Sequence, residues 1–318
     1  MIDSHTLRRV LYGSGDERLR ATWRVAAGVA AFAVAFVSVG LVVSRLPQPG
    51  LLRNAPSILP AVAGTVAVTL VAKRVEDRSV AEQGFSFDRS WWRDLLAGVG
   101  LGGVGMGVTI GLWMETGAVS VVETLSTGVL SAPLAAVAMV TAAIGFLGIG
   151  LWEEVVFRGL LVRNGVDGFV ARGFSRRTAA VGAFLLGVVV FGVTHALVPA
   201  QGATATFAAV QGVLAVVYYT TAYVLTEHLA LPIGLHFSMN FTNAALFPTG
   251  SSVPALVRVE QTLTIEPSVL IVPVVSTVLL TLGIVGWVSF TRGTVSVADC
   301  FATPSQESPR SPLQGSDD

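Results

Sequence analysis

The sequence predicts an all-α, polytopic integral membrane protein with about eight transmembrane helices and both termini in the cytoplasm. Of its 318 residues, 53% are hydrophobic and only 13% are charged, and the mean hydropathy is +0.71. Soluble domains carry a charged fraction of about 25%. The chain also contains several uncharged runs of about 20 residues, the length that crosses a hydrocarbon core of ~30 Å. Composition and run length therefore agree on the same fold class.

The charge balance and the cysteine content exclude two classes of function. Twenty Lys and Arg residues balance twenty Asp and Glu residues, so the basic surface that binds nucleic acid is missing, and we expect no nucleic-acid partner. The single cysteine, Cys300, excludes an intrachain disulfide framework and a cysteine-based zinc cluster. Four histidines and the carboxylates remain for chemistry.

Eight spans follow from the apolar runs in chain order. The first four are uncharged and cover residues 25–44, 55–72, 95–114 and 124–152. The stretch 178–226 is too long for one helix and is divided near Pro199, Gln201 and Gly202 into the fifth and sixth spans. The seventh runs from 229 to about 247 and the eighth from 267 to 291. In the third span, the spacing of small residues favours close helix packing at Gly98, Gly102, Gly103, Gly107 and Gly111.

The basic residues of the loops set the orientation, because Lys and Arg concentrate in short cytoplasmic loops. Almost all of them fall in the amino-terminal segment, the second loop, the fourth loop with its flank, and the tail. The opposite side receives only Arg45, Arg53 and Arg258. The loops rich in arginine and both termini are therefore predicted to be cytoplasmic.

Ionisable side chains inside a span cost roughly 2.5 to 3.5 kcal/mol each, so those present are functional candidates. The first cluster is Glu153, Glu154 and Arg158 in Trp-Glu-Glu-Val-Val-Phe-Arg-Gly. Glu154 and Arg158 are four residues apart, share a helix face and can form an ion pair. Glu153 points about 100° away, lacks that partner, and is a candidate general base on water. The alternative is that the cluster marks the cytoplasmic boundary, with both acids solvated at the headgroups.

Two further clusters pair residues four apart. Phe191 and His195 lie in Phe-Gly-Val-Thr-His, where the histidine is either functional or an ordinary core residue. His236 and Asn240 lie in His-Phe-Ser-Met-Asn and can stabilise an oxyanion, hold a water or form a simple interhelical hydrogen bond. If the fourth helix continues to about Phe169, the helix rise of about 1.5 Å per residue brings the three clusters to one level, roughly 10 Å below the cytoplasmic surface.

In this order on separate spans, Glu-Glu-x-x-x-Arg, Phe-x-x-x-His and His-x-x-x-Asn resemble the signature of the CPBP intramembrane endopeptidases, the CAAX protease and bacteriocin-processing (Abi) family. The resemblance covers about residues 134–247. It implies that Glu153 and His195 activate the attacking water, that His236 and Asn240 bind the developing oxyanion, and that Glu154 with Arg158 supports the site.

The resemblance also raises the question of a metal, because the family is often described as metalloproteases. A zinc ion, Zn²⁺, would take His195, His236 and Glu153 as a two-histidine, one-carboxylate set. A metal-free Glu and His mechanism fits the same side chains. We favour it slightly, because His-x-x-x-Asn is poor at supplying a third strong ligand.

The predicted function is hydrolysis of a peptide bond near the cytoplasmic face by water that Glu and His activate. The expected partners are a peptide or protein substrate, prenylated in eukaryotic relatives of the family, and membrane lipid. Two alternatives stay open: a transporter or proton-coupled carrier, and a non-catalytic membrane protein of the bacteriocin-immunity type. A serine protease is disfavoured because Ser238 faces away from His236 and Asn240.

The chain accordingly divides into five parts. They are a cytoplasmic amino-terminal segment (1–24), three spans with their loops (25–130), a CPBP-like catalytic core (131–250), a loop with the last span (251–292), and a cytoplasmic tail (293–318). The tail is predicted to be disordered because it is rich in Ser, Pro and Asp and shows no periodicity from residue 303 onward.

Overall fold

The computed structural model describes residues 10–12, 19–46, 58–128, 130–199, 202–249 and 254–297. Of the residues that the structure describes, 75% are helical and few are in sheet, which confirms the predicted all-α membrane fold. Within the described ranges, seven helices are long and apolar enough to cross a membrane. They are α2 (Ala21–Ser44), α3 (Ile58–Val75), α4 (Arg89–Glu115), the continuous helix Ala132–Val170, α7 (Arg176–Leu197), α8 (Ala205–Thr226) and α10 (Pro267–Arg292). The predicted tail beyond residue 297, including Cys300, lies outside the described residues.

The helix Ala132–Val170 consists of α5 (Ala132–Glu154), a π-helical segment η3 (Val155–Val162) and α6 (Arg163–Val170). Its end at Val170 agrees with the prediction that the fourth helix continues to about Phe169. Its predicted start at residue 124 is wrong. The β-branched segment Val119–Ser126 forms strand β1 instead, and the helix begins after Ser131, with Pro133 in its first turn.

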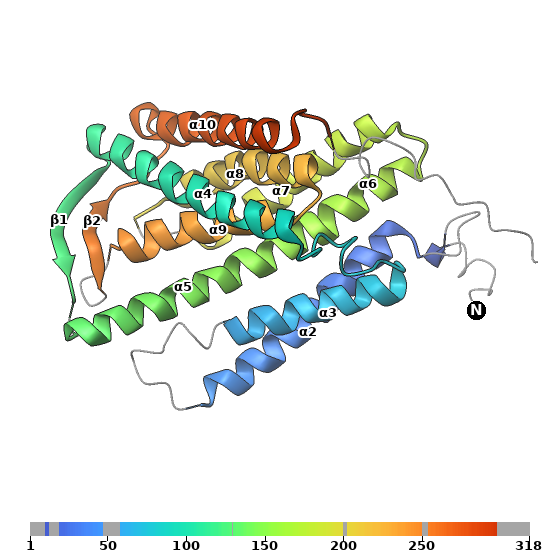
Figure 1. Ribbon diagram of the computed structural model, residues 1–318, viewed down its shortest axis with the longest axis horizontal. Helices are drawn as coiled ribbons and strands as arrows, with labels where there is room; N and C mark the ends of the chain where they lie inside the picture. The colour runs from blue at the N-terminus through green and yellow to red at the C-terminus, as the bar shows by residue number, and fades with distance from the viewer. Residues whose placement is uncertain are drawn as a thin grey trace, which may run out of the picture.

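Strand β1 pairs antiparallel with β2 (Ala255–Gln261) in a two-stranded sheet. The sheet lies at the end of the helix bundle opposite α6 (Figure 1). Arg258 of β2 donates to Glu123 of β1 over 3.0 Å, so one of the few basic residues predicted on the far side is held within this sheet.

The seventh predicted span is shorter than the others. It consists of α9 (Ala230–Phe241, 12 residues) and a π-helical segment η4 (Thr242–Leu246, 5 residues). Helix α9 packs against α4, α5 and α8, and its residues from Ala230 to His236 are all buried. A helix enclosed by its neighbours need not match the thickness of the bilayer, which explains its length.

Local signals fix where several helices begin and end. Asp88 caps α4, since its carboxylate accepts from the Ser90 hydroxyl (2.6 Å) and the Trp91 backbone N–H (2.9 Å). These two hydrogen bonds lower the pKa of Asp88 to about 2. Thr204 caps α8 in the same way, and Gly293 ends α10 in the left-handed conformation.

Glycines bring α4 and α9 into backbone contact. A Cβ at Gly98 would collide with the carbonyl oxygen of Leu231, and one at Gly234 would collide with that of Leu95. The predicted close packing is therefore confirmed for Gly98. It is also confirmed for Gly102, where an added Cβ would collide with the backbone of Leu235. The prediction is wrong for Gly107 and Gly111, because an added Cβ at either position has no described atom within 4 Å.

Gly98→Ala is expected to destabilise the protein by about 1–3 kcal/mol, because the added methyl group forces α4 away from α9. The measurement is the melting temperature of the purified protein in detergent. Gly107→Ala is the matched control, since its methyl group meets open space. Equal melting temperatures for the two variants would contradict the tight α4–α9 contact.

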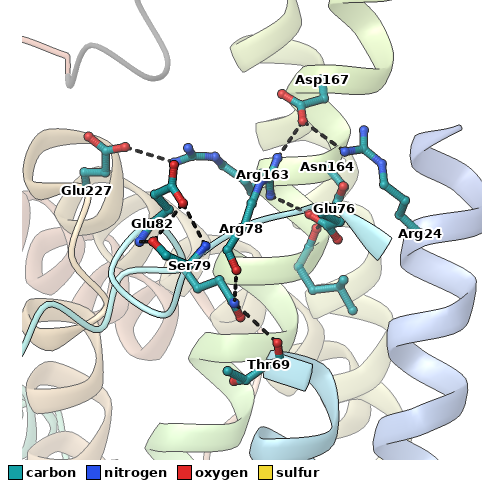
Figure 2. A network of polar contacts seen from close by, with 12 residues as sticks. Arg24, Thr69, Glu76, Arg78, Ser79, Glu82, Arg163, Asn164, Asp167 and Glu227 are labelled. Atoms are coloured by element: carbon teal, nitrogen blue, oxygen red, sulfur yellow. Dashed lines mark hydrogen bonds and ion pairs between the residues drawn. The ribbon is translucent and has the colours of Figure 1, made fainter. Parts of the chain in front are cut away.

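A polar network joins the helix ends near the amino terminus (Figure 2). Asp167 of α6 accepts from Arg78 (2.6 Å) and Arg24 (3.4 Å), and Glu76 forms an ion pair with Arg78 (2.7 Å) and accepts from Asn164 (3.0 Å). Glu76 and Asn164 are buried. The amino-terminal segment, the second loop and the fourth loop thus meet at one end of the bundle, as the loop charges predicted. The assignment of that end to the cytoplasm stays a prediction.

Candidate active site

The first cluster and His236 meet in the centre of the bundle. Glu154, the last residue of α5, is completely buried (0% exposed), and its Oε1 lies 2.7 Å from Nδ1 of His236 and 3.0 Å from a guanidinium nitrogen of Arg158. The predicted ion pair between Glu154 and Arg158 is therefore confirmed. Because a carboxylate accepts hydrogen bonds, the geometry assigns a proton to Nδ1 of His236.

Glu153 lies on the other side of the same imidazole. Its Oε2 is 3.6 Å from Nε2 of His236, which is too long for a direct hydrogen bond. His236 thus stands between two carboxylates, one bonded to it and one facing it across a short gap. The sequence predicted that Glu153 lacks the Arg158 partner, but it did not predict that both acids face His236.

Arg158 is buried beneath this group. Its guanidinium lies 4.8 Å from the ring centre of Phe191 and 4.9 Å from that of Tyr219, in addition to its bond to Glu154. Both distances suit cation–π contacts. The planar guanidinium is thereby held by one carboxylate and two aromatic faces.

Tyr219 is a site residue that the sequence analysis missed. Its ring stacks on His236 with centroids 4.7 Å apart and planes 19° from parallel, and it also faces Arg158. Its hydroxyl reaches the sulfur of Met239 at 3.7 Å. The available signal was the adjacent pair Tyr218 and Tyr219, since aromatic hydroxyl side chains stand out in an otherwise apolar span.

His195 lies beside Phe191, as predicted, with ring centroids 4.2 Å apart. Its Nδ1 lies 2.9 Å from the Phe191 carbonyl oxygen, and Gly212 of α8 leaves space for its side chain. That is its only hydrogen bond within the described part of the chain. His195 therefore connects to His236 through the ring of Phe191, which is 6.5 Å from the His236 ring, and not by a direct bond.

Asn240 lies one turn after His236 on α9. It is half-buried and makes no hydrogen bond to the residues that the structure describes, so its amide remains available. Ser238 faces elsewhere, as predicted, since its hydroxyl bonds the Gly234 carbonyl oxygen (2.9 Å) and packs against Gly102 of α4.

Two of the three helices that carry the motifs change to π-helix at or just after their candidate residues. Segment η3 begins after Glu154 and contains Arg158, and η4 begins two residues after Asn240. Such wide turns are frequent at functional sites. No local sequence signal marked them.

The side chains do not group as a metal site. Within the described ranges, no cluster of three or more His, Cys, Asp or Glu side chains is placed to hold a metal ion. Nδ1 of His236 is bonded to Glu154, and Nδ1 of His195 lies 2.9 Å from the Phe191 carbonyl oxygen. The zinc set of His195, His236 and Glu153 stays a prediction.

Comparison with known families gives an independent result. Residues 134–242 match the family model described as type II CAAX prenyl endopeptidase Rce1-like. This match supports the resemblance to the CPBP endopeptidases for that segment of the chain. All six candidate residues, Glu153, Glu154, Arg158, His195, His236 and Asn240, fall within the match. No curated protein and no solved structure matches the chain.

The match supports a peptidase of the CAAX protease type, and the seven apolar helices support a multi-pass membrane protein. The matched segment excludes α4, yet α4 provides the glycine face on which the His236 helix rests. The site therefore depends on helices outside the family core.

Proposed function

We propose that the chain is an endopeptidase that hydrolyses a peptide bond near the cytoplasmic membrane face with a water activated by Glu153. The observation that carries the proposal is the position of His236 between Glu153 and Glu154, with Arg158 paired to Glu154 in the buried interior. One carboxylate fixes the imidazole, and the other is left to accept a proton.

The reaction follows from these roles. A water that bridges Glu153 and Nε2 of His236 from the side gives its proton to Glu153, and the resulting hydroxide attacks the substrate carbonyl carbon. The oxyanion that forms accepts from the side-chain amide N–H of Asn240. Glu153 then returns the proton to the leaving amide nitrogen as the C–N bond breaks. His195, with its Nε2 unbonded among the described residues, orients the water.

The depth of the group supports a site near the predicted cytoplasmic end. Tyr219 lies seven residues, or ~10 Å, before the end of α8, and His236 lies a similar distance into α9. Those helix ends lie near Arg163, which bonds Glu227 just after α8 (Figure 2). A substrate entering from that end has a short path to His236.

The test is cleavage of a peptide panel by the detergent-purified protein, beside the His236→Ala variant. Peptides with a farnesyl or geranylgeranyl cysteine head the panel, because the matched family is described as a prenyl endopeptidase. Cleavage by the wild type and its loss in His236→Ala is the expected result. No cleavage of any peptide by a folded protein would favour a carrier or an immunity-type protein instead.

The same cleavage assay tests whether a metal ion is required. We expect cleavage to continue in the presence of a strong chelator, because the described side chains do not form a ligand cluster. Loss of cleavage that returns when zinc is added back would instead support the set His195, His236 and Glu153.

Tyr219 is expected to position His236. Tyr219→Phe keeps the ring on His236 and Arg158 and should retain most of the activity, whereas Tyr219→Leu should lower kcat by about tenfold, the equivalent of ~1.4 kcal/mol. The measurement is kcat and KM for both variants on the best peptide of the panel. Equal kcat values for the two variants would contradict a role for the ring.

A further inference from the structure

A groove separate from the candidate active site lies between α4 and α10, which run side by side (Figure 1). Its volume is about 470 Å³. On α4 it is lined from Ala97 to Val108, a length of ~16 Å at the helix rise, and Gly100 forms part of its floor. On α10 it is lined from Ser276 to Trp287. Except for the Ser276 hydroxyl, which accepts from Thr109 (2.8 Å), the lining is apolar.

One end of the groove carries positive charge. Trp287 closes that end, and the guanidinium of Arg93 lies 5.9 Å from its ring centre. Arg93 is exposed and makes no ion pair with any described residue. It is on the groove face of α4, four residues before Ala97.

A second arginine stands at the same end. One terminal nitrogen of Arg292 bonds Asp94 (2.8 Å), and the other is buried and has no hydrogen-bond partner among the described residues. Asp94 also accepts from the indole of Trp287 (2.9 Å), which fixes the ring. Helix α4 begins here and α10 ends here, so the basic end is the one that the loop charges assign to the cytoplasm.

We propose that this groove binds an anionic phospholipid, with an acyl chain between α4 and α10 and the phosphate at Arg93 and Arg292. The occupant follows from the two parts of the site. An apolar slot of this length suits a hydrocarbon chain, and exposed or unsatisfied guanidinium groups at a cytoplasmic helix end recognise phosphate. A zwitterionic headgroup would bring its own cation toward Arg93. The proposal does not depend on the peptidase activity.

A substitution at Gly100 tests whether an acyl chain occupies the groove. An added Cβ there has nothing within 4 Å, so Gly100→Leu fills the groove without disturbing the packing of α4. Gly286→Leu is the matched control, because Gly286 on α10 is exposed, also meets open space and does not line the groove. Arg93→Gln tests the charge separately.

The experiment titrates phosphatidylglycerol or phosphatidylcholine into each purified variant in neutral detergent and follows the melting temperature. The wild type and Gly286→Leu should show a larger shift with phosphatidylglycerol than with phosphatidylcholine. Gly100→Leu should lose the shift. Arg93→Gln should bind phosphatidylglycerol about fivefold more weakly, as removal of one interfacial charge implies.

Three results would overturn the proposal. They are equal shifts with the two lipids in the wild type, an unchanged phosphatidylglycerol shift in Gly100→Leu, and an unchanged affinity in Arg93→Gln. If a second copy of the chain covered the groove in place of lipid, the protein would form a concentration-dependent dimer without lipid. That result would also count against the proposal.

Discussion

Replacing Glu153 with glutamine is expected to abolish cleavage while the protein still folds and inserts. Glutamine keeps the size of the side chain but cannot take a proton from water, so the step that forms the nucleophile is lost. General-base catalysis contributes typically 10²- to 10⁴-fold, and we expect kcat to fall by at least about 10²-fold. The measurement is single-turnover cleavage of the best peptide, with the melting temperature as the check on folding.

Glu260→Gln is the matched control for this experiment. Glu260 is an exposed carboxylate on β2, in the sheet at the far end of the bundle, so its loss should leave cleavage unchanged. Full activity in Glu153→Gln would remove Glu153 from the mechanism. Loss of activity together with loss of the folded state would assign it a structural role.

Arg158→Ala is expected to have the largest effect on stability. Arg158 is 1% exposed, pairs with the fully buried Glu154 and lies against Phe191 and Tyr219. Removing one partner of a buried ion pair leaves the other charge uncompensated, at a cost of about 3–5 kcal/mol. Yield of folded protein and the melting temperature in detergent measure the effect.

Arg158→Lys separates charge from shape. Lysine keeps the positive charge near Glu154 but has no planar group to lie on the two rings, so its melting temperature should fall between those of the wild type and Arg158→Ala. If Arg158→Ala were as stable as the wild type yet inactive, Arg158 would be a participant in the reaction and not a structural partner of Glu154.

Several features were determined by the sequence alone. The apolar runs located the long helices, because a segment that crosses a bilayer must be apolar over about 20 residues whatever its neighbours are. The contacts between residues four apart, Glu154 with Arg158 and Phe191 with His195, followed from the helix repeat. Both kinds of feature depend only on local geometry.

Other features were decided by the tertiary structure. The bond from His236 to Glu154 joins residues 82 positions apart, and the stack of Tyr219 on His236 joins two different helices. Such contacts depend on how each helix is rotated and how deep it lies. Packing sets both, and here α9 is held where Gly98 and Gly234 bring two backbones together.

The predictions that were wrong also concern contacts between distant parts of the chain. The end of strand β1, residues 124–126, was predicted to be the start of a span because β1 is stabilised by β2, which is far away in the chain. Gly98 and Gly107 look alike in sequence, yet one is at a helix contact and the other faces open space. The sequence therefore determined which helices form and which side chains share a face. Only the packing of those faces decided that His236 stands between Glu153 and Glu154, because rotation and depth are properties of the assembled bundle and not of any single helix.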